Sequence, residues 1–492
     1  MPSSRSHSPE PAAADPPLPP GGAGTIGILI VSAFVVILNE TTMNIALREI
    51  MADMGVDERT AQWLATAFLL TMAVVIPVTG RLLQRVRTRP LFLGAMGAFA
   101  TGTLLAALAP GFPVLLAARV VQACGTAVMM PLLMTTIMEL VPASRRGRFM
   151  GNVSVVIAVA PAVGPVLSGL VLSFASWRWV FLTVLPIAVL MLGIGAWRLR
   201  DVGELRPARV DPLSVPLAAA GFGGLVFAFT RFGGEGGGPW ADPLPFLLLA
   251  GSLAVLALFA WRQRVLQRRD EALLDLRVLR SAGYRAGVVI ISLSMLVLLG
   301  TVILLPLLMQ GAFGLEPLQV GLVTLPGGLL MGVVGKIAGR LSDRYGARPL
   351  VIAGTCVTAS TCLLYAMLLA PYTPWWFFSV VHMCTCLGLA FTFTPVFSTA
   401  LGSLPRERYS HGSAFMSTMQ QLGGAAGTAV FVTVMVAFGG GAAEAGGDAR
   451  GIVSGARIAF ALGCGIGLLA VAASWRLRDA RQAEPGAAQP RS

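Results

Sequence analysis

Two short stretches of this chain, one in each half, are nearly the same. Residues 80–91 read Gly80-Arg-Leu-Leu-Gln-Arg-Val-Arg-Thr-Arg-Pro-Leu91, and residues 339–350 read Gly339-Arg-Leu-Ser-Asp-Arg-Tyr-Gly-Ala-Arg-Pro-Leu350. Seven of the twelve positions carry the same residue without a gap. Each stretch follows one long apolar run and precedes another. The repeat therefore indicates two halves of like topology.

Apolar runs of helix-spanning length recur from residue 25 to the end of the chain. The 492 residues are 55% hydrophobic and only 12% charged, which is too little polar surface to cover a soluble domain. Each run can cross about 30 Å of hydrocarbon as a helix, whereas open strands would leave unpaired backbone groups in lipid. We expect an all-α integral membrane protein with about fourteen transmembrane helices. The expected spans are 25–47, 60–79, 90–109, 113–140, 150–174, 177–197, 213–230, 243–261, 287–309, 320–338, 349–370, 374–400, 411–437 and 456–475.

Arginine is concentrated in alternate connections between these runs. Arg145, Arg146 and Arg148 share one connection, whereas connections 110–112 and 371–373 carry no charge. Arginine-rich connections face the cytoplasm, so the alternation predicts cytoplasmic N- and C-termini. The net charge of +13 then reflects orientation in a membrane, and we expect no nucleic-acid partner. Arginine in place of lysine, with abundant alanine, glycine and proline, suggests a GC-rich bacterial gene, and we expect the protein in the cytoplasmic (inner) membrane. Four tryptophans at external span ends are expected to form an aromatic belt: Trp177, Trp179, Trp375 and Trp376.

The runs divide the chain into five parts. We expect a disordered cytoplasmic tail (1–24), an N-terminal six-helix bundle (25–200), two extra helices with linkers (201–283), a C-terminal six-helix bundle (284–476) and a cytoplasmic C-tail (477–492). No connection is long enough to form a separate soluble domain or an ATPase module. The six cysteines lie in apolar stretches and are expected to act as packing residues, so we predict no metal site and no cofactor.

Further motifs accompany the repeat. They are Leu38-Asn-Glu-Thr-Thr-Met-Asn-Ile-Ala-Leu47, Arg119-Val-Val-Gln-Ala-Cys-Gly125, Gly164-Pro165 and Trp177-Arg-Trp-Val-Phe181. Together with the repeat and the 6+2+6 order of spans, they resemble the major facilitator superfamily, and within it the fourteen-span drug:proton antiporters of the EmrB/QacA type. The resemblance covers nearly the whole chain from residue 25. It implies a transporter, with no enzymatic activity, that exports small hydrophobic compounds against protons by alternating access.

Two charged residues inside the apolar runs are the candidates for proton coupling. Glu40 lies in the first span, where an ionisable carboxylate is costly unless it is paired or hydrated, so an acid at this depth is a functional candidate. A carboxylate away from water holds its proton more readily, so Glu40 is suited to carry one reversibly. Arg119 lies at a similar depth in the fourth span and needs a buried acceptor such as Glu40 or Gln122. The resemblance implies proton transfer at Arg119, and it places the usual acid one position earlier, at Asn39.

Two sets of residues are candidates for conformational change. Gly164, Pro165 and Gly169 give the fifth span a small-residue face, and the resemblance implies the antiporter motif there. The repeated stretches are expected to form cytoplasmic gating loops that open and close between the two halves. In the second half, Asp343 can complement a helix dipole; in the first half, Gln84 replaces the acid. The loop residues are Gly80, Arg81, Gln84, Gly339, Arg340, Asp343 and Arg344.

Seven polar residues in the spans are candidates for the substrate cavity: Asn39, Asn44, Gln122, Gln310, His382, Gln420 and Gln421. The expected partners are a small hydrophobic substrate, protons and the lipid bilayer, with a monomer as the functional unit. A dedicated exporter of one endogenous metabolite is the nearest alternative. An importer or uniporter of a small polar solute is a third possibility, although such sites need more converging polar groups than these spans offer.

Overall fold

The structure is a computed structural model that describes residues 19, 21–202, 211–232, 243–439 and 449–477, except the side chains of Asn44, Ile45, Glu58 and Pro317. The described part is helical and contains no strands. Its α-helices are α1 (Gly22–Met54), α2 (Glu58–Ala61), α3 (Trp63–Arg85), α4 (Thr88–Ala107), α5 (Phe112–Leu140), α6 (Arg146–Leu172), α7 (Arg178–Arg198), α8 (Ser214–Ala218), α9 (Gly224–Arg231), α10 (Leu244–Leu266), α11 (Ala282–Gly311), α12 (Pro317–Tyr345), α13 (Ala347–Leu368), α14 (Trp375–Gly402), α15 (Tyr409–Phe438) and α16 (Ala449–Ser474).

Fourteen helical segments in the described residues are long and apolar enough to cross a membrane, which confirms the expected number. Helices α8 and α9 form one of these segments, Ser214–Arg231, because a π-helical turn, Ala219–Gly223, joins them without a break. The predicted tail 1–24 lies almost entirely outside the described residues, and α1 begins at Gly22. The predicted domain boundaries remain a prediction.

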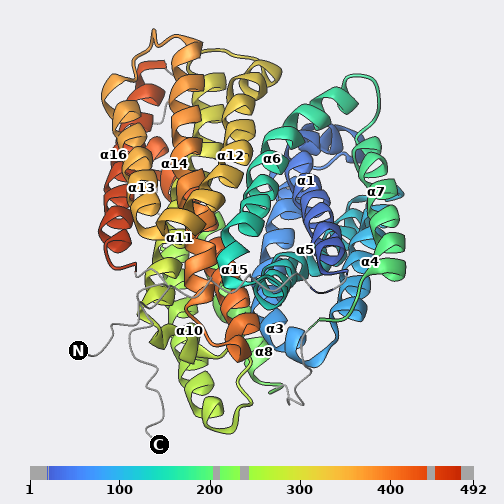
Figure 1. Ribbon diagram of the computed structural model, residues 1–492. Helices are drawn as coiled ribbons and strands as arrows, with labels where there is room; N and C mark the ends of the chain where they lie inside the picture. Colours follow the sequence, from blue (N-terminus) through green and yellow to red (C-terminus); the bar gives the residue numbers. More distant parts are fainter. Residues whose placement is uncertain (1–18, 20, 203–210, 233–242, 440–448, 478–492) are drawn as a thin grey trace, which may run out of the picture.

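The spans form two six-helix bundles with an inserted pair (Figure 1). One bundle holds α1 and α3 to α7, and the other holds α11 to α16. They meet where α6 packs along α12 and where α15 packs against α3 and α5. The inserted pair, α8–α9 and α10, contacts both α3 and α15, so it covers one seam between the bundles. Asp211, just before α8, accepts two hydrogen bonds of 2.8 Å from Arg262 of α10, which lowers the pKa of Asp211 to about 2.

The repeated stretches are not loops, contrary to the prediction. Helix α3 continues to Arg85 and α12 continues to Tyr345, so Gly339 through Arg344 form the last turns of a helix. Hydropathy underestimated these helices because polar residues extend them beyond the apolar run. Helix α12 ends only at Gly346, whose φ of 89° is a left-handed conformation that interrupts the helix.

Three of the four tryptophans that are expected to form an aromatic belt have exposed side chains. Trp179, Trp375 and Trp376 are exposed, as residues at a membrane interface are. Trp177 is buried instead, and its Nε1 donates a 3.0 Å hydrogen bond to Asp53 at the end of α1. Hydrogen bonds from Arg178 and then Trp177 lower the pKa of Asp53. The ionised carboxylate of Asp53 therefore joins the end of α1 to the start of α7.

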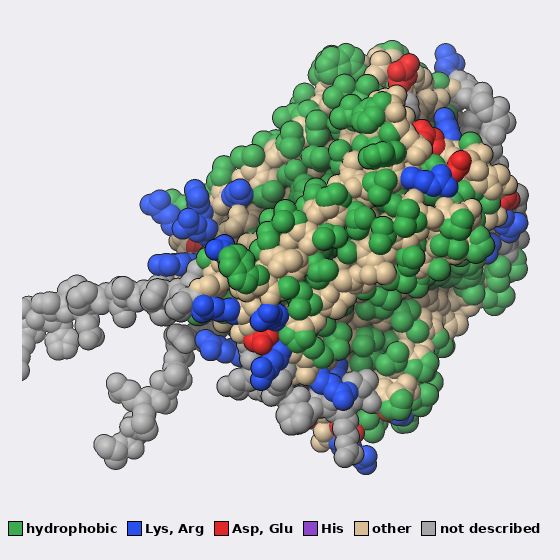
Figure 2. Space-filling view, turned by 90° about the vertical axis from the view of Figure 1, so that its right-hand side faces the viewer, with side chains coloured by type: hydrophobic (Ala, Val, Ile, Leu, Met, Phe, Trp, Pro, Cys, Tyr) green, Lys and Arg blue, Asp and Glu red, His purple; other side chains and the backbone are tan. Residues whose placement is uncertain are grey.

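Charge is distributed unevenly over the surface. Figure 2 shows hydrophobic side chains across the middle of the visible face, with many lysine and arginine side chains at its lower left and others beside acidic side chains at its upper right. We refer to the end formed by residues 86–87, 141–145, 267–281, 346 and 403–408 as the arginine-rich end. The even number of spans places the start of α1 and the end of α16 at this same end.

Candidate functional site: a buried charge pair in the first bundle

Arg119 lies inside the first bundle on α5. It is 2% exposed, and its Nη1 donates a 3.0 Å hydrogen bond to Oε1 of Gln122 one turn along the same helix. Gln122 in turn donates from Nε2 to Thr103 of α4 at 2.9 Å. The guanidinium carbon lies 4.1 Å from the centre of the Phe68 ring on α3, a cation–π contact. Three helices therefore position this cation away from water.

The hydrogen-bonding capacity of Arg119 is not fully used. Its Nε atom is buried and has no hydrogen-bond partner among the described residues. A buried guanidinium donor without an acceptor costs free energy, and a nearby anion or a bound molecule can relieve that cost. Arg119 is thus able to respond to a change of charge beside it.

Glu40 of α1 supplies such a charge. Its carboxylate interacts electrostatically with Arg119, although no hydrogen bond or ion pair joins Glu40 to any described residue. The side chain is half-buried. A carboxylate that is close to a fixed cation but not bonded to it can gain or lose a proton without breaking a contact. The arrangement suits a proton-binding group better than a structural ion pair.

Asn39 precedes Glu40 and is also buried. Both its side-chain oxygen and its side-chain nitrogen lack hydrogen-bond partners among the described residues. An amide with neither group satisfied is unusual in a folded interior, so Asn39 stays a candidate for the substrate cavity. Asn44 is on the same helix, but its side chain is outside the described part of the chain.

Helix α6 packs closely against α1 directly after Glu40. Ser168 donates a 2.9 Å hydrogen bond to the carbonyl of Thr42, and Thr41 donates to the carbonyl of Ala160 at 3.5 Å. A Cβ atom added to Gly164 would lie 2.1 Å from Oγ1 of Thr41 and 2.9 Å from its Cβ. Gly164 thus permits the close approach, whereas Gly169 faces open space. Pro165 lies within α6 beside this contact.

The second bundle repeats this packing between its own first and fifth helices. A Cβ atom on Gly423 of α15 would lie 2.5 Å from the carbonyl oxygen of Ser292 on α11. On Gly427 it would lie 2.1 Å from the carbonyl oxygen of Leu296. The pair α11 and α15 therefore corresponds to the pair α1 and α6, as expected for repeated halves.

These contacts predict different effects for two glycines of one motif. Gly164→Ala forces α1 and α6 apart beside Glu40, and overpacking of this kind costs about 1–3 kcal/mol. We expect a lower thermal unfolding temperature for the purified protein and slower transport. Gly169→Ala is the matched control, which should leave both unchanged or raise stability slightly, since alanine favours helix. Equal losses in the two variants would contradict the assignment of the contact to Gly164.

The two bundles are joined by hydrogen bonds toward the arginine-rich end. Asp343 of α12 accepts hydrogen bonds from the backbone N–H of Gly147 (2.9 Å) and Arg148 (3.0 Å), in the first turn of α6. Gly339 and Gly147 face each other so closely that a Cβ on either would strike the carbonyl oxygen of the other. Asp343 thus binds the positive end of a helix in the opposite bundle, an interaction that we term the Asp343 contact.

The corresponding contact of the first repeat is weaker. Gln84 of α3 donates a 3.2 Å hydrogen bond to the carbonyl of Glu407, just before α15, and accepts one from Arg81 at 3.1 Å. Arg81 also donates to the carbonyl of Asp270 at 2.5 Å. A neutral amide therefore occupies the position at which the second repeat has a carboxylate. In that repeat, Arg340 is exposed and Arg344 lies over the ring of Tyr345 on its own helix.

Comparison with known proteins agrees with this architecture. Residues 29–428 match the Major Facilitator Superfamily. The chain belongs to the Major Facilitator Superfamily. The lincomycin resistance protein LmrB of Bacillus subtilis is 38% identical over 421 residues, which cover 83% of this chain and 84% of that protein. LmrB of Listeria monocytogenes is 37% identical over 412 residues, covering 84% and 86%. The multidrug resistance protein B homolog of Mycobacterium tuberculosis is 28% identical over 417 residues, covering 84% and 76%.

Solved structures show the same superfamily fold. The human organic anion transporter MFSD10 (TETRAN) superposes with a TM-score of 0.68 at 15% identity, covering 93% of this chain and 100% of that one. The proton:xylose symporter XylE, bound to a bromodeoxyglucose, gives a TM-score of 0.65 at 14% identity, with 94% and 96% covered. At these identities the likeness concerns the fold alone.

The four remaining candidates for the substrate cavity form no described contact with Glu40. His382 of α14 is buried with its Nε2 3.5 Å from the sulfur of Cys386, and its Nδ1 has no described partner. Gln420 donates weakly to the sulfur of Met295 at 3.9 Å. Gln421 is half-buried, and Gln310 is exposed near the end of α11. No described contact brings these four residues to the charge pair, so their place in a substrate cavity remains a prediction.

Several contacts between the bundles had no clear sequence signal. Arg146 is buried and donates to the carbonyls of Val141 (3.2 Å) and Met138 (3.0 Å) and to the hydroxyl of Tyr409 on α15 (3.2 Å). Arg145 and Arg148 lie beside it in the sequence, and such a cluster of arginines predicts only the topology. Arg146 is thus buried like Arg81 and Arg119. Two hydroxyl pairs also join the bundles: Thr135 with Ser413 at 2.6 Å, and Ser154 with Thr394.

Proposed function

We propose that this protein is a proton-coupled antiporter that exports small hydrophobic compounds by alternating access. The observation that carries the proposal is the unbonded carboxylate of Glu40 beside the buried guanidinium of Arg119. When Glu40 is ionised, it compensates the charge of Arg119. When it is protonated, that compensation is lost, so the two protonation states favour different arrangements of α1 and α5. Coupling requires such a differential interaction.

The names of the relatives support the class of substrate. Two of them are lincomycin resistance proteins and a third is a multidrug resistance protein homolog. We therefore propose lincomycin as the first compound to test. The energy source is the proton gradient, with no cofactor, and the protein performs no covalent chemistry on its cargo.

The orientation follows from the arginine-rich end. Connections rich in arginine remain in the cytoplasm, so we place this end, and both chain termini, on the cytoplasmic side of a bacterial inner membrane. The Asp343 contact then closes the cytoplasmic side in the arrangement that the structure describes. The opposite state requires that this contact break, which opens the path from the cytoplasm.

Expression in a bacterium that lacks its own efflux pumps tests the proposal. We expect the lincomycin concentration that stops growth to rise severalfold, and a protonophore to remove the protection. A panel of other toxic compounds, tested in parallel, separates broad from narrow recognition. The proposal fails if the protein is present in the membrane and neither lincomycin nor any compound of the panel is tolerated better.

A further inference from the structure

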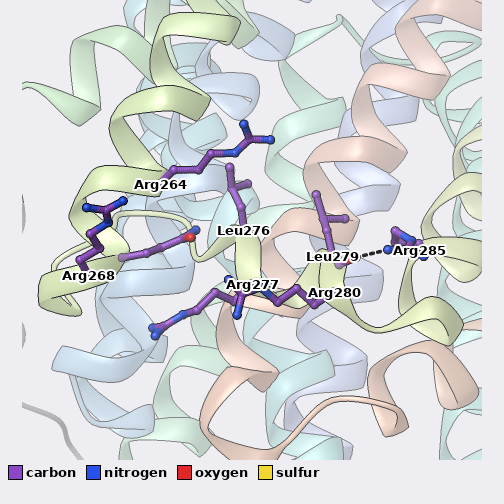
Figure 3. Close-up of a pocket in the computed structure, with 8 residues that line it drawn as sticks. Arg264, Arg268, Leu276, Arg277, Leu279, Arg280 and Arg285 are labelled. Atoms are coloured by element: carbon purple, nitrogen blue, oxygen red, sulfur yellow. Dashed lines mark hydrogen bonds between the residues drawn. The ribbon is translucent and has the colours of Figure 1, made fainter.

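A cavity of about 590 Å³ opens at the arginine-rich end, away from the charge pair. Figure 3 shows it between the end of α10, the linker that follows and the start of α11. Five of its eight lining residues are arginines, with Gln267, Leu276 and Leu279 completing the wall. The arginines are Arg264, Arg268, Arg277, Arg280 and Arg285. A concave surface of such composition attracts an anion.

Most of this charge is not compensated. Arg277 pairs with Asp270 at 2.5 Å and with Asp275 at 2.9 Å. Arg264, Arg268 and Arg280 form no ion pair or hydrogen bond with any described residue, and all three are exposed. Arg285 donates only to the carbonyl of Leu279, at 3.2 Å. The cavity therefore holds an excess of positive charge.

The cavity also contains a hydrogen-bond donor that lacks an acceptor. The side-chain nitrogen of Gln267, another lining residue, is buried and has no described hydrogen-bond partner. A buried donor without an acceptor is unfavourable, and an oxygen of a bound anion would satisfy it. Tetrahedral phosphate oxygens match several guanidinium groups and one amide at once.

The surface beside the cavity is apolar and faces lipid. Leu258, Trp261 and Val265 are exposed on α10, and their spacing places them with Arg268 on one face of the helix. The span Leu244–Arg269, which contains α10, is the least buried of the fourteen, because the rest of the protein buries only 17% of its most apolar part. An anion seated among the arginines could thus carry acyl chains along this face.

We propose that the cavity binds the phosphate headgroup of an anionic phospholipid, with its acyl chains along the exposed face of α10. The bilayer offers phosphatidylglycerol-type headgroups at this depth, and cationic pockets at helix ends recognise them. Bound lipid would hold the linker in place. The carbonyl of Asp270 in that linker accepts the hydrogen bond from Arg81, so the lipid also supports the closed side of the transporter.

Native mass spectrometry of the purified full-length protein tests this site, with phosphatidylglycerol, phosphatidylethanolamine and water-soluble glycerol phosphate as probes. We expect phosphatidylglycerol to bind most tightly and to raise the thermal unfolding temperature. The variant Arg264→Gln/Arg268→Gln/Arg280→Gln should bind it on the order of a hundredfold more weakly, since each arginine near the surface contributes about fivefold.

The matched control is Arg85→Gln/Arg198→Gln/Arg476→Gln, which removes the same charge from exposed positions at the same end. It should keep the affinity for phosphatidylglycerol. Equal weakening in both triple variants would contradict the proposed site, because the total positive charge of this end, and not the cavity, would then explain the binding. Equal binding of phosphatidylethanolamine would also overturn it. If glycerol phosphate binds as tightly as the lipid, the ligand is a free phosphate compound and the lipid proposal fails.

Discussion

Replacing Glu40 with glutamine should reduce efflux driven by a pH gradient to the level of membranes without the protein. The amide has nearly the same shape but cannot bind or release a proton, so Arg119 experiences one constant neighbour throughout the cycle. The bundle itself should still insert, because a neutral side chain costs less in the membrane than a carboxylate. Transport of a fluorescent or radiolabelled cargo in everted vesicles, energised by a pH gradient, measures the effect.

Glu49→Gln is the matched control for this prediction. It makes the same chemical change on the same helix, but beyond the apolar segment Gly22–Met43 that contains Glu40. We expect it to retain efflux close to that of the unchanged protein. Undiminished pH-driven efflux by Glu40→Gln would remove Glu40 from the mechanism. Loss in both variants would mean that transport is sensitive to any change of charge on α1, and that Glu40 is not a specific proton site.

Substitution of Asp343 should shift the balance between the two states of the transporter. Asp343→Ala removes both hydrogen bonds from the carboxylate to the first turn of α6. Hydrogen bonds to a charged group contribute about 1.5 kcal/mol each at the low end, so the closed cytoplasmic side should lose about 3 kcal/mol. An equilibrium constant changes by roughly a hundredfold for that energy. Distances between spin labels on α6 and α12 at the arginine-rich end report the shift.

Gln84→Ala is the comparison for Asp343→Ala, because it occupies the same position in the first repeat. It removes one neutral hydrogen bond between Gln84 and the carbonyl of Glu407, which contributes about 1 kcal/mol. We expect a roughly fivefold shift, well below that of Asp343→Ala. If the two variants shift the label distances equally, the carboxylate has no special role in closing the cytoplasmic side.

The number and type of spans could be predicted from the sequence because lipid requires long apolar helices, and a hydropathy pattern records that requirement directly. The ends of the helices could not be predicted as well. Helix α12 continues seven residues beyond the predicted end at residue 338, through a polar segment in which hydropathy carries no signal. Trp177 lies at the start of α7 as predicted, but its burial could not be predicted because it depends on Asp53, a partner far away in the sequence.

The candidate site also contains residues that could be predicted from the sequence and residues that could not. Glu40 and Arg119 could be found because a charge inside an apolar run is expensive, and Gln122 was among the acceptors considered for Arg119. The Phe68 ring over the guanidinium depends on how α3 packs against α5, which no local pattern reveals. Similarly, Asp343 was expected at a helix N-terminus, but the sequence alone did not show that the helix is α6 of the opposite bundle.

The central claim is that Glu40 exchanges its proton as cargo crosses the membrane, and proton movement itself tests this most directly. Purified protein in liposomes that contain a pH-sensitive dye should move protons inward when cargo leaves, and cargo should accumulate against its own gradient only while a pH gradient exists. Liposomes with Glu40→Gln should show neither effect. Uphill transport of cargo that is unchanged when the pH gradient is dissipated, or proton movement that persists in Glu40→Gln, would contradict the claim.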